Sequence, residues 1–140
     1  MGLAMFAWHT PSLYEAALRS EFWHGLEHAS FFLVSLMFWW PVVLPWPSRG
    51  QWPRWAMVPY LLVADLQNTA LSAILTFSDR VLYRSYSEVP RLFGLSALQD
   101  QVAAGAFMWV AGSLAFILPA IVLAVRCLST SADRRALSAA

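Results

Sequence analysis

The chain has 140 residues, of which 59% are hydrophobic, 15% aromatic and only 12% charged, with a formal net charge of +1. Soluble domains carry about 25% charged residues, so a water-exposed fold of this size is excluded. The aromatic content excludes a disordered chain, and the even balance of basic and acidic residues excludes a basic nucleic-acid-binding surface. The remaining class is an integral membrane protein. One cysteine, Cys127, excludes an internal disulfide framework.

The N-terminal region is expected to contain one short helix ahead of the membrane spans. The stretch from Met1 to Trp8 is apolar but lacks a basic region and a small-residue cleavage site, so it is not expected to be a signal peptide. Residues 11–20 follow Thr10, a good N-cap residue, and begin with Pro11, which favours the first helical position. This helical lead-in either lies on the membrane or extends the first span.

Three apolar stretches are long enough to cross a bilayer as helices, which takes about 20 residues each. They lie at about residues 22–40, 55–77 and 101–125, and the first is expected to stop at Pro41. The sequence therefore predicts an all-α integral membrane protein with three transmembrane helices. Residues 1–128 are expected to form a single membrane domain, and residues 129–140 a flexible tail.

The arginines of the loops are divided almost evenly between the two sides of the membrane. One side carries Arg19, Arg80, Arg84 and Arg91, and the other carries Arg49, Arg54, Arg126, Arg134 and Arg135. The positive-inside rule thus only weakly favours a cytoplasmic C-terminus.

Residues with metal-binding chemistry gather at the starts of the first and third spans. His24 and His28 are four residues apart, so both imidazoles project from one helix face. The start of the third span lies on the same side of the membrane, and it carries Asp100, Gln101 and Met108. Imidazole and thioether groups suit copper, and thioether favours the cuprous ion. The sequence therefore predicts a copper site formed by His24, His28, His9, Asp100 and Met108.

Each of these residues also has a structural interpretation. A histidine in a membrane helix can hydrogen-bond across helices, Met108 can fill a packing gap, and Asp100 can cap the third helix. Glu27 is expected to pair with or orient a histidine instead of binding metal. Cys127 is expected to be inert.

Asp65 lies near the middle of the second span, where a carboxyl group is costly. It is expected to face the bundle interior or a partner, either as a metal or proton relay position or as a protonated acid bonded to Asn68 or to another subunit. Gly105 and Gly112 share one face of the third span and predict close helix packing.

The sequence gives little support to haem binding or to enzyme activity. A bis-histidine haem needs axial ligands on opposite sides of the ring, and the three histidines all lie in one short segment. Only a homodimer can supply both ligands, so haem is not expected. The sequence contains no Ser/His/Asp triad, phosphate loop or paired acidic site, and no enzyme activity is expected.

Three segments carry a family resemblance: WHTPSLYEAALR…HGLEHASFFLVSLMFWWPVV, LTFSDRVLYRSY and LSALQDQVAAGAFMWVAGSL. They resemble the CtaG family of polytopic cytochrome c oxidase assembly factors, from about Trp8 to Leu114. Family members have more spans, and the resemblance covers only their C-terminal part, without the N-terminal helices. The matching polar motif positions are His9, His24, His28, Tyr83, Tyr86, Asp100, Gln101, Met108 and Trp109. Asp65 has no place in the family pattern.

The resemblance implies a multi-pass protein of the bacterial inner membrane that helps to assemble a haem–copper oxidase and binds or hands over copper there. The alternative is a non-catalytic accessory subunit of a larger membrane complex, and a haem-binding dimer is a third hypothesis. The expected partners are membrane lipid and oxidase subunits or another membrane chain, in a homo- or hetero-oligomer, without nucleic acid.

Overall fold

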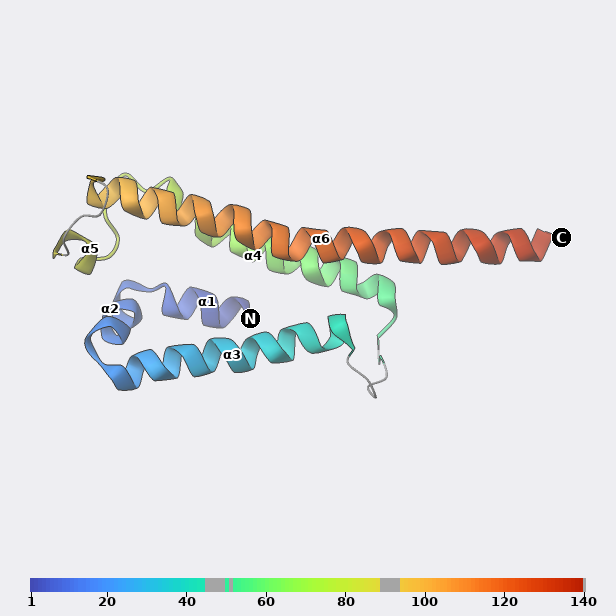
Figure 1. The fold of residues 1–140 in the computed structure, drawn as a ribbon, viewed down its shortest axis with the longest axis horizontal. Helices are drawn as coiled ribbons and strands as arrows, with labels where there is room; N and C mark the ends of the chain where they lie inside the picture. The colour runs from blue at the N-terminus through green and yellow to red at the C-terminus, as the bar shows by residue number, and fades with distance from the viewer. Residues whose placement is uncertain (45–49, 51, 89–93, 140) are drawn as a thin grey trace.

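The computed structural model describes residues 1–44, 50, 52–88 and 94–139, and these residues form helices without any strand (Figure 1). The elements are α1 (Gly2–Trp8), α2 (Pro11–Arg19), α3 (Glu21–Val43), the short 3-10 helix η1 (Arg54–Ala56), α4 (Met57–Thr76), α5 (Ser85–Glu88) and α6 (Ala97–Ala139). Three stretches, Glu21–Val43, Arg54–Thr76 and Ala97–Thr130, are long and apolar enough to cross a membrane. The predicted all-α, multi-pass membrane architecture is therefore confirmed.

The N-terminal region differs from the prediction, because it contains two helices. Residues Gly2–Trp8 form α1, which the sequence did not predict. The lead-in is a separate helix, α2, since Ser20 adopts an extended conformation (φ −140°, ψ 122°) that interrupts the chain before α3. Pro11 occupies the first turn of α2 as predicted, but the Thr10 hydroxyl does not cap it and donates to the carbonyl of Ala7 (2.7 Å).

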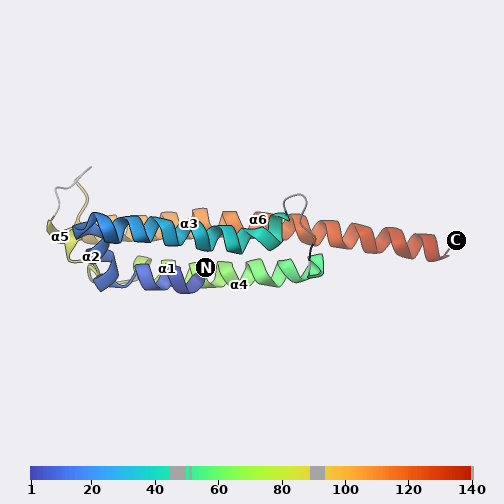
Figure 2. The ribbon, with the colours of Figure 1, turned by 90° about the horizontal axis from the view of Figure 1, so that it is seen from below.

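Helix α1 packs alongside the long helices, where it contacts α2, α3 and α4. Both views show its N-terminal end near the middle of the molecule (Figures 1 and 2). Met1 packs against the central hydrophobic cluster, and the indole nitrogen of Trp8 donates to the hydroxyl of Ser30 on α3 (2.8 Å). The N-terminal segment thus helps to hold α3 in place.

The end of α3 is also different from the prediction. The helix does not stop at Pro41 but continues to Val43, and Leu44 ends it in the left-handed conformation (φ 48°). Proline removes one backbone donor, and its ring crowds the preceding turn. Side chains from the next segment bind carbonyls on either side of Pro41: the Tyr60 hydroxyl donates to Phe38 (3.2 Å), and Arg54 donates to Val42 (3.2 Å). Pro45 and Pro47 lie outside the described residues.

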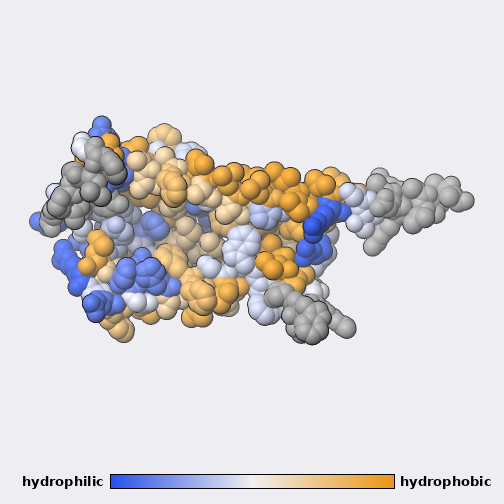
Figure 3. All heavy atoms as spheres, in the orientation of Figure 1, coloured by the Kyte–Doolittle hydropathy of each residue, from blue (hydrophilic) through white to orange (hydrophobic). Residues whose placement is uncertain are grey.

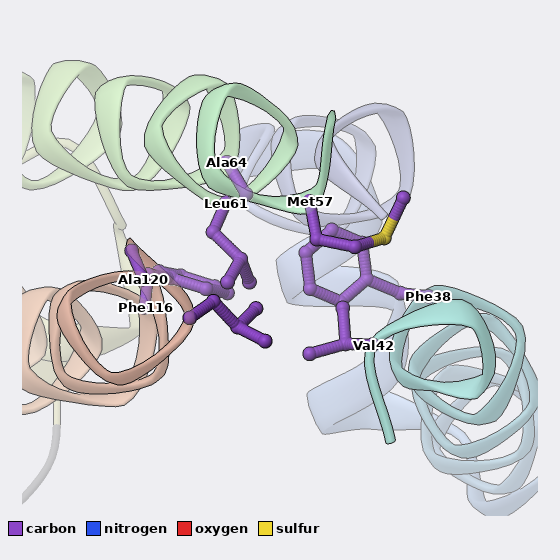
Figure 4. Close-up of a cluster of buried hydrophobic side chains, with 8 residues drawn as sticks. Phe38, Val42, Met57, Leu61, Ala64, Phe116 and Ala120 are labelled. Carbon is purple, nitrogen blue, oxygen red and sulfur yellow. The ribbon is translucent and has the colours of Figure 1, made fainter. Parts of the chain in front are cut away.

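A cluster of buried hydrophobic side chains joins the three long helices (Figure 4). Their side chains point toward one another from α3, α4 and α6, with Leu61 of α4 fully enclosed. The members are Phe38, Val42, Met57, Leu61, Ala64, Phe116, Ala120 and Leu123. Phe38 stacks on Tyr60 with ring centroids 4.7 Å apart, and its ring edge meets Phe116 at 5.8 Å. The cluster fixes the C-terminal half of α3 against the other two helices.

Helices α4 and α6 form the most extensive helix pair, and glycines on α6 permit their close approach. A Cβ atom at Gly105 would lie 2.9 Å from the Cβ of Leu75 and 3.0 Å from the backbone nitrogen of Thr76. A Cβ atom at Gly112 would lie 2.6 Å from the amide carbon of Asn68. The close packing predicted at Gly105 and Gly112 is confirmed.

The C-terminal part of α6 extends beyond the predicted span. The sequence placed the end of the third span near Val125 and a flexible tail after residue 128, whereas α6 is helical to Ala139 and contains Pro119 without a break. A helix of 43 residues is about 64 Å long, which exceeds the roughly 30 Å hydrocarbon core of a bilayer. Helix α6 is therefore too long to lie wholly within the hydrocarbon core if it stands along the membrane normal, and the flexibility of its last residues stays a prediction.

The glycine packing predicts that Gly105→Ala destabilises the helix bundle. The added methyl group meets a Cβ atom and a backbone nitrogen of α4, neither of which can move alone, and overpacking of this kind costs about 1–3 kcal/mol. Unfolding of the detergent-solubilised chain in a dodecyl sulfate titration, followed by circular dichroism, measures the change.

Gly25→Ala is the matched control, because Gly25 is also helical but has no neighbouring atom within 4 Å of the place that an added Cβ would occupy. Here alanine only improves helix propensity, by up to about 1 kcal/mol. Equal stability of the two variants would show that Gly105 is not a close-contact position.

Candidate functional site

The candidate site lies at the end of the molecule where α3 and α6 both begin. Figure 1 places α2, α5 and the first turns of α3 and α6 at this end, while α6 runs on to the C-terminus at the other. The prediction that the starts of the first and third spans lie on the same side of the membrane agrees with this arrangement. The site therefore draws its residues from the first turns of α3 and α6 and from the loop that precedes α6.

His24 and His28 form a pair on α3. Their spacing of four residues places both rings on one face, and the two Nε2 atoms are 3.1 Å apart. The rings meet edge to face with centroids 4.5 Å apart, and both side chains are exposed on the outside of the bundle. Both Nε2 atoms thus converge on one point that is open to the surroundings.

Glu27 approaches this pair from the side, as expected. Its Oε2 atom is 3.7 Å from Nδ1 of His24, and its side chain is only 20% exposed. A carboxylate facing Nδ1 favours the tautomer with the proton on that nitrogen. Nε2 of His24 then carries the lone pair, which is the form that a metal ion requires.

The other three predicted ligands lie apart from this pair. His9 ends α1, and its Nδ1 atom contacts the carbonyl oxygen of Met5 (2.8 Å). Asp100 lies in the first turn of α6, where its backbone nitrogen donates to Ser96 (3.0 Å). Met108 lies deeper: it lines a groove of about 390 Å³ with Trp39 and Asn68.

The depth of Met108 explains why it does not join the histidines. Helix α6 begins at Ala97, earlier than the sequence indicated, so Met108 is about 16 Å along the helix, whereas His28 is about 10 Å along α3. Trp39, beside Met108, is about 16 Å farther along α3 than His28. Within the described parts of the chain, no three His, Cys, Asp or Glu residues come close enough to hold one metal ion. The structure therefore brings together two of the five predicted ligands.

The family comparison matches this chain over residues 1–130 to the family described as cytochrome c oxidase caa3 assembly factor (Caa3_CtaG). The match covers more than half of the chain. The chain belongs to this family. The resemblance to CtaG-type assembly factors is thereby confirmed, and the role that the family describes is assembly of cytochrome c oxidase. Comparisons with curated proteins and with solved structures found no significant match.

In this member of the family, two motif residues hold the loop between α4 and α6. Gln101 is only 2% exposed, and its Oε1 atom accepts from the backbone nitrogen of Leu82 (2.8 Å). Its Nε2 atom donates to the carbonyls of Arg80 (3.2 Å) and Leu75 (3.4 Å). Tyr83, also buried, donates through its hydroxyl to the carbonyl of His9 (3.0 Å). The side chain of Tyr86 lies outside the described residues.

Glu15 is a further link that the sequence motifs did not single out. One carboxylate oxygen accepts from the backbone nitrogen of Arg84 (3.0 Å), and the other pairs with Arg19 (3.0 Å). The rings of Tyr14 and Tyr83 are also in contact, with centroids 4.2 Å apart and their planes tilted by 36°. Helix α2 is therefore tied to the loop after α4. Glu15 directly follows Tyr14 within the segment WHTPSLYEAALR, and that position was the available signal for it.

Four polar residues of α4 follow one face at helical spacing: Asp65, Asn68, Ser72 and Thr76. Asn68 and Thr76 face the glycines of α6. Asn68 and Ser72 are buried, at 3% and 0% exposure. Within the described residues, Oδ1 of Asp65 and Nδ2 of Asn68 are both buried without a hydrogen-bond partner. The predicted bond between Asp65 and Asn68 is therefore not formed through these atoms. Asp65 is half-buried, and its role as a relay position stays a prediction.

The contacts of Gln101 predict that Gln101→Leu loosens the loop after α4. Leucine leaves the Leu82 amide and the Arg80 carbonyl without their partner, which costs about 1–3 kcal/mol. Hydrogen exchange at the Leu82 amide is then faster by about 5- to 150-fold.

Gln99→Leu is the control, because Gln99 is exposed and accepts only a local bond from the Ser96 nitrogen (2.9 Å). Leu82 exchange is expected to stay unchanged in this variant. Equal exchange rates in the two variants would contradict the assigned role of Gln101.

Proposed function

We propose that this chain assists the assembly of a bacterial haem–copper cytochrome c oxidase by binding copper at His24 and His28 and passing it on. The family description supplies the assembly role. The single observation that supports copper handling is the exposed histidine pair, whose Nε2 atoms converge at 3.1 Å. Imidazole nitrogens suit copper, and a metal ion can replace the hydrogen bond between them.

The spacing of the pair is close to that of two ligands on one ion. Imidazole nitrogens about 2.0 Å from a metal are about 3.3–3.5 Å apart for tetrahedral to trigonal geometry. The observed 3.1 Å needs only a small side-chain rotation to reach that separation. Both residues belong to one helix, so the two-ligand arrangement is fixed before a metal arrives.

Two ligands on an exposed surface leave coordination positions open. An open position allows another protein or another copy of the chain to supply the third ligand, and exchange of that ligand is how an ion passes between proteins. This proposal assigns a chaperone role in a homo- or hetero-oligomer and no catalytic step. His9, Asp100 and Met108 remain candidates for the third ligand only if the bundle rearranges.

We further propose that the chain lies in the bacterial inner membrane with its C-terminus in the cytoplasm. Arg54 and Arg126 lie at the end where α4 begins, and the small excess of arginines there favours a cytoplasmic position for that end under the positive-inside rule. The starts of α3 and α6 lie at the opposite end, so the histidine pair then faces the outer side of the membrane (Figure 1).

Copper analysis of the purified chain tests this proposal. The detergent-solubilised protein, loaded with cuprous ion under a reductant and freed of excess, is expected to retain about one ion per histidine pair. The double variant His24→Ala/His28→Ala is expected to lose it. Met108→Leu, which keeps the side-chain volume in the deep groove, is the matched control and is expected to retain copper.

The copper content of the oxidase made in cells distinguishes copper handling by this chain from an assembly role that does not involve copper. In cells that depend on this chain, the double histidine variant is expected to yield oxidase deficient in copper. Fully loaded oxidase from those cells would refute copper handling and leave the assembly role intact. That result would favour an accessory structural role, which the buried polar contacts of Gln101 also suit.

A further inference from the structure

A groove at the opposite end of the molecule from the histidines contains two arginines. It has a volume of about 530 Å³ and lies between η1 and the C-terminal half of α6, which are in contact. Arg54 and Trp55 line it from η1, and Arg126 and Thr130 line it from α6. In Figure 3, a hydrophilic patch at the start of α4 lies directly beside the hydrophobic surface of α6.

The two guanidinium groups face this groove without a carboxylate partner among the described side chains. Arg54 uses one nitrogen to bind the Val42 carbonyl (3.2 Å), which leaves its other donors available, and neither Arg54 nor Arg126 takes part in a described ion pair. Apart from Asp65 in mid-span, the acids with described side chains belong to the opposite end of the molecule: Glu15, Glu21, Glu27, Asp79 and Asp100. The groove is therefore a local concentration of positive charge.

Most of the remaining lining of the groove is apolar and belongs to segments that can span a membrane. Leu123 is 5% exposed on the groove wall, and Trp55 is 65% exposed at the start of the second span. Tryptophan at a span terminus is typical of the boundary between headgroups and hydrocarbon. Two cations at the headgroup level above an apolar wall match a molecule with an anionic head and hydrocarbon chains. Charge complementarity thus selects one class of occupant.

We infer that the groove between η1 and α6 binds an anionic phospholipid, with its phosphate held by Arg54 and Arg126 and its acyl chains along Trp55 and Leu123. Guanidinium groups bind phosphate oxygens through paired hydrogen bonds in addition to charge. The two arginines come from different spans, so a bound lipid bridges the start of α4 and the far half of α6. This site is independent of the proposed copper chemistry.

Native mass spectrometry of the full chain in detergent tests the inference, with phosphatidylglycerol and phosphatidylcholine of identical acyl chains as probes. Phosphatidylglycerol is expected to bind more tightly than phosphatidylcholine. Each arginine near an anionic headgroup contributes about fivefold to binding, so Arg54→Gln/Arg126→Gln is expected to weaken phosphatidylglycerol binding by about 25-fold. Phosphatidylcholine binding is expected to change little.

Arg19→Gln/Arg80→Gln is the matched control, because it removes the same charge at the other end of the molecule and is expected to retain phosphatidylglycerol. Arg54→Lys/Arg126→Lys keeps both charges and is expected to retain the preference for phosphatidylglycerol. The inference would be overturned if Arg54→Gln/Arg126→Gln and Arg19→Gln/Arg80→Gln weakened phosphatidylglycerol binding equally. It would also be overturned if Arg54→Lys/Arg126→Lys bound phosphatidylglycerol as weakly as Arg54→Gln/Arg126→Gln. Displacement of phosphatidylglycerol by excess inorganic phosphate would also overturn it and indicate a site for the free anion.

Discussion

The close approach of α4 and α6 is the constraint on which the rest of the bundle depends. In a bilayer the surrounding lipid is as apolar as the side chains, so helices associate through tight packing and buried polar contacts. Gly105 and Gly112 supply the tight packing, since a methyl group at either position would overlap α4. The same approach buries Asn68 and Ser72. Helix α3 then joins this pair through the cluster around Phe38, and α1 contacts both α3 and α4.

The two ends of the molecule differ in chemistry, because most described acidic side chains lie at one end and the arginines of the η1–α6 groove lie at the other. Acidic side chains, the histidine pair and the loop held by Gln101 lie where α3 and α6 begin. Arginines without described acidic partners lie where α4 begins. The proposed copper and lipid sites both depend on this separation, since positive charge beside the histidines would repel a metal cation and carboxylates beside the arginines would repel an anionic headgroup.

The sequence predicted the features that depend on local spacing or on span length. Apolar runs located the three spans, and the four-residue spacing of His24 and His28 predicted their shared face. The features that it missed depend on tertiary contacts. Helix α1 has only seven residues and is stabilised by contacts with α3 and α4, and the turn after Pro41 is supported by Tyr60 and Arg54. Met108 was placed too shallow because the predicted start of α6 was four residues late.

The attachment of α3 has a geometric consequence for the histidines. Phe38 is held by Tyr60 at one end of the helix, and His24 lies about 21 Å away along the axis. A tilt of about 5° around that attachment moves the far end by about 2 Å, whereas metal–ligand bonds tolerate about 0.2 Å. The distance between His24 and His28 is unaffected by such a tilt, because both residues belong to α3. Any bond from that pair to a group on α4 or α6 therefore depends on how firmly Trp8 of α1, through its hydrogen bond to Ser30, holds the first half of α3.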